Sequence, residues 1–201
     1  MTEEIRIYVE GGGDSSHGKA RLRQGFNAFF GAVIDAARNK RTRWAVIPAG
    51  SRNSCFDDFC NACKDHPDAL NILLVDAESA VCKKPREHLC NQDGWGVEAP
   101  EEACHLMTQT MEAWLVADRD ALSEYYGQGF LSSAIPNNTN VEDIDKAMLE
   151  SALENATRGT QKGSYKKIRH GADLLSQIDP KIVRAKAQHC ERLFQTLESL
   201  I

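Results

Sequence analysis

Carboxylate side chains follow two apolar segments of the sequence at the points where the segments end. Residues 5–9 alternate apolar and polar side chains, a period of two that predicts a strand, and Glu10 closes this strand before three consecutive glycines. The apolar run in 71–79, NILLVDAES, predicts a strand covered on both faces, and it ends in Asp76 and Glu78. If the two strands are parallel neighbours, the three acids converge at the carboxyl edge of the sheet, where such folds bind ligands.

Clustered carboxylates repel one another and attract a cation, and hard oxygen ligands favour Mg²⁺ or Mn²⁺. Ions held in this way activate water and stabilise charge on a phosphate, which is the chemistry that phosphodiester cleavage requires. Glu10 is also a candidate general acid or base, and the following glycines let the backbone approach a bound group closely. The pattern therefore favours metal-dependent phosphodiester hydrolysis, and the alternative is a set of solvated acids at strand ends.

A second interpretation of the same region is a nucleotide-binding loop. Gly13 to Lys19 spell GxxxxGK, and the acidic strand before Glu78 is of the kind that accompanies such a loop. However, Ala20 stands where a Ser or Thr would hold Mg²⁺, and Glu10 and Asp14 place negative charge where phosphates would lie. Nucleotide binding is therefore the weaker alternative, and Asp14 is a secondary candidate for the acidic site.

Alternating strands and helices are predicted to position these residues. Apolar residues in 17–40 recur at helical spacing, 44–47 forms a short strand closed by Pro48, and 55–67 is helical. With the two acidic strands, this alternation predicts an α/β fold with an open, mainly parallel sheet and helices on both faces.

The second half of the sequence begins with a polar, irregular stretch, 80–100, that is expected to be a surface excursion or lid. Residues 105–110 predict a fourth strand, which places Glu112 at a strand-to-helix junction on the acidic edge. The alternative is one helix from Cys104, with His105 on its polar stripe. A helix over 111–127 would stop at Gly127.

A loop-rich segment, 127–140, divides the chain into a catalytic domain, 1–128, and a helical C-terminal extension, 129–201. Three helical stretches are predicted in the extension. The first begins after the cap Asn140, the second covers 164–178, and the third starts at Pro180 after the cap Asp179. The third carries an apolar stripe that packs internally or against a partner: Leu193, Phe194, Leu197, Leu200 and Ile201.

Composition indicates a globular protein of the cytoplasm. The 201 residues are 42% hydrophobic and 26% charged, and no apolar run approaches the roughly 18 residues that span a bilayer. The first residues lack the pattern of a signal peptide, so the seven cysteines are expected to be reduced thiols. The net charge of −5 excludes a generally basic nucleic-acid coat, although local basic clusters remain.

Several segments together resemble a family of small bacterial proteins described as a domain of unknown function with a Toprim-like core. Toprim is the catalytic fold shared by topoisomerases, primases and overcoming-lysogenization-defect nucleases. The segments that carry the resemblance are VEGGGDS (9–15), GSRNS (50–54), LLVDAES (73–79), HLMTQTMEAWLVAD (105–118) and SYKKIRHGADLLSQIDP (164–180).

The resemblance assigns roles to individual residues. The Toprim signature is a glutamate after the first strand and an Asp-x-Asp pair after the third. Glu10 matches the first, and Asp76-Ala77-Glu78 matches the second with a longer acid in the last position. The resemblance implies that these acids and Glu112 bind the metal ions. Further residues fall at motif positions: Lys167 as a catalytic and phosphate-binding group, Arg52, Lys166 and His170 as phosphate-binding groups, and Asp118 as a secondary candidate.

The same resemblance implies partners. Members of this family are often encoded beside an ABC-type or AAA-type ATPase, so the chain is expected to be a nuclease effector of an ATPase-linked anti-phage defence system that cleaves DNA or RNA. The alternative from another class is a non-catalytic Toprim-like subunit that binds the ATPase through its C-terminal helices. Whether the chain also forms a homo-oligomer is left open by the sequence.

Overall fold

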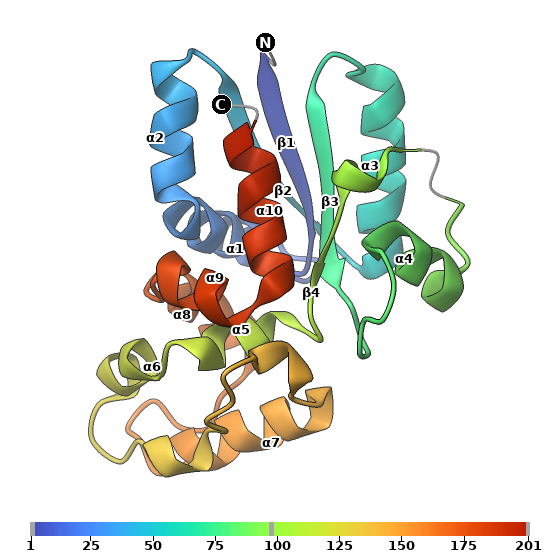
Figure 1. Cartoon of the computed structure of the whole chain (residues 1–201). Coiled ribbons are helices and arrows are strands. Elements are labelled where there is room, and N and C mark those ends of the chain that lie inside the picture. Colours follow the sequence, from blue (N-terminus) through green and yellow to red (C-terminus); the bar gives the residue numbers. More distant parts are fainter. Residues whose placement is uncertain (1–2, 97–98, 200–201) are drawn as a thin grey trace.

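The centre of the fold is a sheet of four parallel strands in the order β2-β1-β3-β4, seen in the computed structural model of residues 3–96 and 99–199 (Figure 1). The strands are β1 (Glu4–Glu10), β2 (Arg43–Gly50), β3 (Leu70–Asp76) and β4 (Cys104–Met107). In the register, Val9 of β1 is opposite Leu74 of β3, so the last residues of both strands reach the same edge. The predicted α/β fold with a parallel sheet is confirmed.

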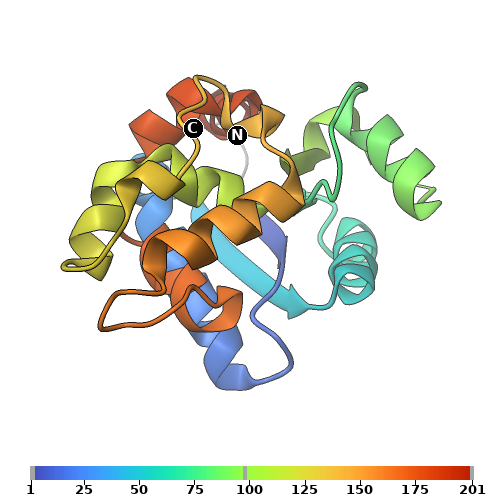
Figure 2. The same ribbon diagram turned by 90° about the horizontal axis from the view of Figure 1, so that it is seen from below.

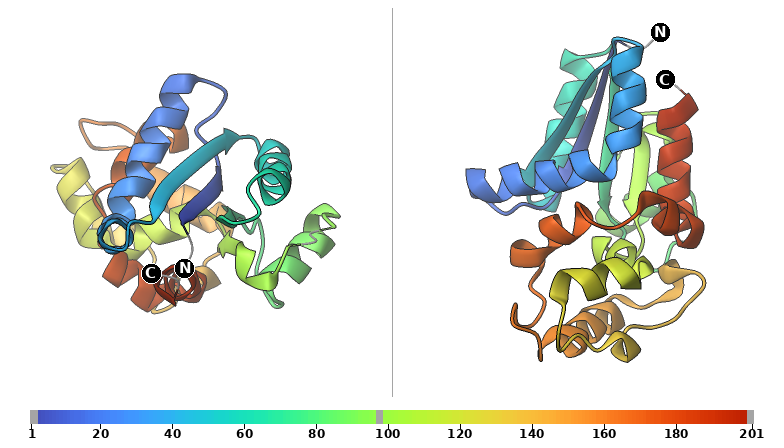
Figure 3. Two further views of the ribbon diagram at one scale, coloured as in Figure 1. Left: turned by 90° about the horizontal axis from the view of Figure 1, so that it is seen from above. Right: turned by 90° about the vertical axis from the view of Figure 1, so that its left-hand side faces the viewer.

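The two faces of the sheet are covered by different helices because side chains alternate along each strand. Ile5, Ile7 and Val9 pack in one core with helices α1, α2 and α10, whereas Tyr8 and Leu73 pack in the other core with α3 and α4. Figure 3 shows α1 and α2 on the opposite side of the sheet from α3. The helix bounds are α1 (Ser16–Phe29), α2 (Gly31–Asn39), α3 (Arg52–Asp65), α4 (Pro85–Asp93) and α10 (Gln188–Ser199).

A second group of helices lies beneath the carboxyl edge of the sheet, which Figure 2 views from below. The group comprises α5 (Met111–Ala117), α6 (Arg119–Tyr126), α7 (Lys146–Thr157), α8 (Lys167–Leu175) and α9 (Pro180–Lys186), with short 3₁₀ turns at Glu101–Ala103, Ser132–Ala134 and Val141–Asp143. The predicted helical C-terminal segment is therefore present. One buried cluster joins its side chains to those of β1 and α1, so the helices are held against the edge where the acids lie.

Three predicted helices are each divided in two. The helix predicted over 17–40 breaks at Phe30, the one over 111–127 breaks at Asp118, and the last one breaks at Ala187. Asp118 accepts a hydrogen bond from the Ala121 amide and so caps α6, which starts a new helix inside an otherwise helical pattern. Asp179 and Pro180 begin α9 as predicted.

Other boundaries also differ from the sequence prediction. Strand β2 continues through Pro48 to Gly50, which an edge strand permits because the missing N–H is not needed on its open side. The region 80–100, predicted to be irregular, contains α4, which begins at Pro85. Asn140 caps the 3₁₀ turn at Val141–Asp143, and Asp145 caps α7. The strand predicted at 105–110 is confirmed as β4, and the alternative single helix from Cys104 is wrong.

The last helix packs internally. Leu193, Phe194 and Leu197 of α10 are buried, and the Phe194 ring centre lies 5.7 Å from that of Phe29, while Leu200 and Ile201 lie outside the described residues. In the part of the chain that the structure describes, the cysteines form no disulfide bonds with one another. None of the described helices has both the length and the apolar composition of a membrane span.

Candidate acidic site at the carboxyl edge of the sheet

Glu10 and Asp76 are the last residues of the adjacent strands β1 and β3. The strand order reverses between these two strands, and ligands of open α/β sheets bind at such a point. Both side chains line one small cavity of about 100 Å³, together with the glycines after β1 and with Lys167 of α8. The expected convergence of acids from distant segments is therefore present for this pair.

Asp76 and Glu112 face the same lysine. The Lys167 ammonium Nζ lies 2.6 Å from Asp76 Oδ2 and 3.4 Å from Glu112 Oε2. Both carboxylates are almost completely buried, at 3% and 2% exposure. The second oxygen of each is also bonded, since Asp76 Oδ1 accepts the Met111 amide at 2.8 Å and Glu112 Oε1 accepts the Tyr165 hydroxyl at 2.8 Å. This arrangement fixes both acids and the lysine in position.

Arg52, at the start of α3, connects Glu10 to Asp93. Its Nη1 donates to Glu10 Oε2 at 3.0 Å and to the Asp76 carbonyl oxygen. Its other nitrogens form a bidentate pair with Asp93, at 2.8 Å for each bond, and its guanidinium lies 5.1 Å from the Trp95 ring centre. Such a pair fixes the plane of the guanidinium as well as its charge.

Burial and mutual repulsion make ionisation of the two strand-end acids less favourable than usual. The pKa of Glu10 is raised mainly by burial and then by the nearby Asp76 carboxylate. Burial also raises the pKa of Asp76, against the opposing effect of Lys167. Partial burial acts against the charge of Lys167, but Asp76 and Glu112 outweigh it and raise the pKa of the ammonium. The lysine is therefore a permanent cation at neutral pH.

The glycine loop between β1 and α1 forms one wall of the cavity. Gly11, Gly12 and Gly13 all have positive φ angles, of 113°, 84° and 62°, which other residues rarely adopt. The loop lies against α1 so closely that a Cβ on Gly18 would be 2.2 Å from the Gly12 carbonyl oxygen. Lys19, the lysine of the GxxxxGK pattern, donates to the Ala49 carbonyl at 3.1 Å instead of pointing into the loop.

Glu78 does not line this cavity. Its carboxylate pairs with Lys146 of α7 at 2.5 Å, and its amide donates to the Gln109 carbonyl at 2.8 Å. Its φ angle is 65°, a conformation that non-glycine residues reach at an energetic cost and that is enriched at functional sites. The two acids of the Asp76-Ala77-Glu78 segment thus face different cations.

The remaining candidates lie around the site. Lys166 is exposed and pairs with Glu154 at 3.3 Å. His170 is buried, and its Nδ1 accepts the Lys166 amide at 3.2 Å. Asp118 is buried and links two helix starts, because besides capping α6 it accepts the Asp179 amide at 2.8 Å. Asp14 is exposed in the loop before α1.

The donor types at the cavity fit a hard divalent ion, but their arrangement around it is incomplete. Glu10 and Asp76 supply carboxylate oxygens at the cavity, Glu112 does not line the cavity but contacts Lys167, and the charge of Arg52 is already shared with Asp93. Within residues 3–96 and 99–199, however, no three His, Cys, Asp or Glu side chains are grouped so that they could hold a metal ion. The Lys167 ammonium lies among the oxygens instead.

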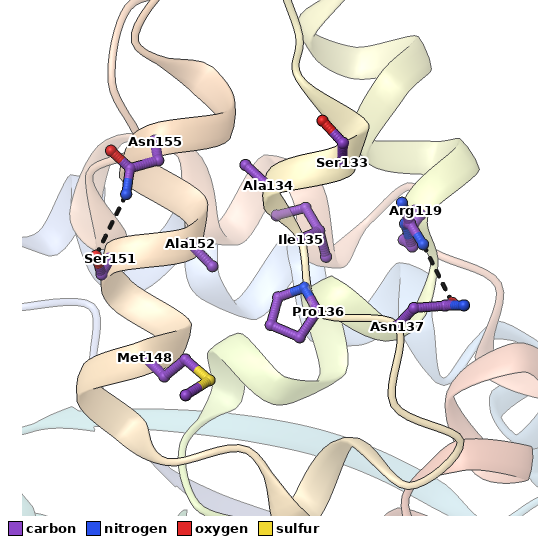
Figure 4. Close-up of a pocket in the computed structure, with 10 residues that line it drawn as sticks. All are labelled: Arg119, Ser133, Ala134, Ile135, Pro136, Asn137, Met148, Ser151, Ala152 and Asn155. Atoms are coloured by element: carbon purple, nitrogen blue, oxygen red, sulfur yellow. Dashed lines mark hydrogen bonds between the residues drawn. The ribbon is translucent and has the colours of Figure 1, made fainter.

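A larger hollow, of about 660 Å³, lies between α7 and the 3₁₀ turn at Ser132–Ala134 (Figure 4). Its polar side chains are bonded to one another, with Arg119 donating to Asn137 at 3.1 Å and Asn155 donating to Ser151 at 3.4 Å. None of the predicted site residues lines it. Arg119 is the one charged side chain among the described residues that line this hollow, so the hollow lacks a group of acids like that of the acidic site.

Four residues of the site were not predicted: Tyr165, Asp93, Trp95 and Lys146. Tyr165 stands two residues before Lys167 in the segment that carries the resemblance, which is the signal that could have identified it. Asp93 and Trp95 lie in the region predicted to be irregular, so no periodic pattern pointed to their contact with Arg52.

The fold and the site place this chain in the class of α/β proteins that have a parallel sheet, acidic residues where the strand order reverses, and helices covering that edge. The chain belongs to the family described as domain of unknown function DUF4276, whose model matches residues 9–198. The matched range includes every candidate site residue named above. Comparisons with curated proteins and with solved structures each found no match.

Proposed function

We propose that this chain is a divalent-metal-dependent nuclease of Toprim type that hydrolyses phosphodiester bonds. The observation that supports the proposal best is the pairing of Glu10 and Asp76 at the ends of adjacent parallel strands, where each carboxylate contacts a cationic side chain, Arg52 for Glu10 and Lys167 for Asp76. The resemblance to Toprim-like proteins encoded beside an ABC-type or AAA-type ATPase extends the proposal to an effector of an ATPase-linked anti-phage system.

In this proposal Glu10, Asp76 and Glu112 would hold Mg²⁺ or Mn²⁺ once Lys167 moves aside. The ion would supply an activated water and charge stabilisation at the phosphate. Arg52 keeps Glu10 oriented through its 3.0 Å bond. Lys167, after leaving the carboxylates, donates to a phosphate oxygen and offsets the charge that develops there.

The test is cleavage of labelled single-stranded and double-stranded DNA and RNA by the purified protein in Mg²⁺ or Mn²⁺, with and without the neighbour-encoded ATPase. Glu10→Gln and Asp76→Asn should each lower the rate by at least about 100-fold, by analogy with the loss of one stabilising group in other active sites. Asp14→Asn is the matched control, because this acid is exposed outside the cavity, and it should cleave like the wild type. Cleavage that persists undiminished in both site variants would refute the proposal.

Glu78 and Glu112 compete for the role of the third acid. The Toprim signature favours Glu78, whereas the contacts of Lys167 favour Glu112. Comparing Glu78→Gln with Glu112→Gln in the same assay separates the two. We expect the larger loss for Glu112→Gln, because Glu112 shares a cation with Asp76.

A further inference from the structure

A row of cationic side chains lies next to the acidic site, where α8 packs on α1. This basic ridge consists of Arg21 of α1, Arg169 of α8 and Lys162 of the loop before α8, and the Tyr125 ring of α6 contacts Lys162. Arg21 Nη2 donates to the Arg169 carbonyl at 2.9 Å, and Lys162 Nζ lies 4.6 Å from the Tyr125 ring centre. In Figure 2 the blue α1 and the orange-red α8 are neighbours at the carboxyl edge.

The ridge carries net positive charge on a chain whose overall charge is −5. Asp173 contacts the ridge, since it accepts Arg21 at 2.7 Å and the Tyr125 hydroxyl at 3.3 Å. Across the part of the chain that the structure describes, neither Lys162 nor Arg169 forms an ion pair with a carboxylate. Both side chains are exposed, so their charges face solvent.

The same two helices, α1 and α8, contribute residues to both the ridge and the cavity. Lys167 and Ile168, which precede Arg169, both line the cavity, and so does Leu22, the residue after Arg21. Ile168 is 75% exposed, an unusual position for a large apolar side chain at the rim of a charged site. The chain neighbours of Arg21 and Arg169 thus line the cavity.

We propose that the basic ridge binds the sugar–phosphate backbone of a nucleic-acid strand and holds the phosphate next in line at the acidic site. The inference rests on the proposed nuclease function and adds where the substrate lies. Carboxylates outnumber cations at the cavity and would repel a phosphodiester, so affinity has to come from cations outside it. Exposed Ile168 and the Tyr125 ring supply the apolar contacts that accompany strand binding.

The test is the binding of labelled single-stranded DNA, single-stranded RNA and duplex DNA, followed by fluorescence anisotropy over a range of salt in EDTA, so that cleavage cannot interfere. The ridge variant combines Arg21→Gln, Lys162→Gln and Arg169→Gln. The matched control combines Arg38→Gln, Arg41→Gln and Arg43→Gln, which removes the same charge at the amino edge of the sheet.

We expect the control to bind like the wild type and the ridge variant to bind at least about tenfold more weakly. The magnitude of the slope of log K against log salt should fall by about 2 to 3, since each of the three lost phosphate contacts contributes roughly 0.7 to 0.9. Arg21 also pairs with Asp173, so a double variant, Lys162→Gln with Arg169→Gln, keeps that contact. Because it removes two of the three cations, its slope should change by roughly two thirds as much as that of the triple variant.

Equal affinity and slope for the ridge variants and the control would overturn the proposal, and so would a wild type that binds none of the three polymers. The strand type that binds most tightly identifies the substrate. Binding through the ridge without cleavage in any divalent ion would refute the nuclease function alone, because the binding assay contains no metal.

Discussion

The ammonium of Lys167 lies 2.6 Å from Oδ2 of Asp76, a contact between residues 91 positions apart. It joins the first residue of α8 to the last residue of β3 and so attaches the C-terminal helices to the acidic edge of the sheet. Because the lysine lies where a second cation would be repelled, this ion pair couples cation binding at the site to the position of α8.

Replacing Lys167 by methionine should strengthen divalent-ion binding. The substitution keeps the apolar stem and removes a positive charge among three carboxylates. Two unit charges about 4 Å apart interact by roughly 4 kcal/mol at an effective dielectric constant of 20, and half-exposure of the lysine reduces this. We therefore expect at least about a tenfold gain in Mn²⁺ affinity by isothermal titration calorimetry.

The matched control for this prediction is Lys166→Met, which removes an exposed lysine paired with Glu154 outside the cavity. Its Mn²⁺ affinity should equal that of the wild type. An unchanged affinity in Lys167→Met would show that the lysine does not compete with the ion.

Replacing Tyr165 by phenylalanine should destabilise the fold. The hydroxyl of Tyr165 donates to the buried Glu112 carboxylate at 2.8 Å, and its loss leaves that oxygen without its donor. Such a loss costs about 1 to 3 kcal/mol, and 1 kcal/mol lowers Tm by about 2 to 4 °C in a chain of this size. Thermal melting followed by circular dichroism measures the change.

Tyr125→Phe is the control for the tyrosine prediction, since its hydroxyl bonds Asp173 at 3.3 Å in a partly exposed position. Its Tm should fall by less than that of Tyr165→Phe. The prediction fails if the two variants melt at the same temperature.

The acids at the strand ends could be predicted because they depend on local pattern alone. Alternating or continuous apolar residues identify β1 and β3, and a parallel register then brings Glu10 and Asp76 together. The helix breaks at Phe30 and Asp118 were missed because the apolar spacing continues across them, and the new helix starts depend on tertiary contacts such as the bond from the Asp179 amide to Asp118.

The partners of the acids could not be predicted, since they come from segments without a distinguishing pattern. Asp93 and Trp95 contact Arg52 from a segment whose sequence predicts no regular element. Lys146, at the start of a helix and 68 residues away in the sequence, pairs with Glu78. The sequence indicates which acids meet at an edge, but the cation that each acid takes depends on how the covering helices pack.

Replacing Gly18 by alanine should displace the glycine loop. A Cβ at this position would lie 2.2 Å from the Gly12 carbonyl oxygen, a backbone atom that cannot move without the loop. Overpacking of this kind costs about 1 to 3 kcal/mol, which urea unfolding can measure. Because the loop walls the acidic cavity, the nuclease activity proposed for this site should fall as well.

Gly31→Ala is the control for the loop prediction. Gly31 begins α2, and nothing lies within 4 Å of a Cβ built there, so alanine should be neutral or stabilise by up to about 1 kcal/mol. Equal stabilities for the two alanine variants would contradict the close approach of the loop to α1.

Burial of His105 should make the protein sensitive to acid. Its Nε2 donates to the Glu102 carbonyl at 2.9 Å, and its Nδ1 accepts from Arg192 at 3.1 Å, so the folded state holds the neutral ring. Burial and then Arg192 lower the pKa of His105 from 6.5 to about 3. A histidine with a lowered pKa contributes stability above pH 6.5, and this stability is lost as the pH falls toward 3.

Between pH 6.5 and 4.5 the loss from His105 amounts to about 2 to 3 kcal/mol, at roughly 1.4 kcal/mol per pH unit. His105→Gln replaces the ring by an amide that does not titrate, so its unfolding free energy should fall less between pH 7.5 and 4.5 than that of the wild type in urea titrations. His17→Gln, at an exposed position, should follow the wild type. If His105→Gln and His17→Gln lose the same stability on acidification, the neutral buried ring is not what makes the fold acid-sensitive.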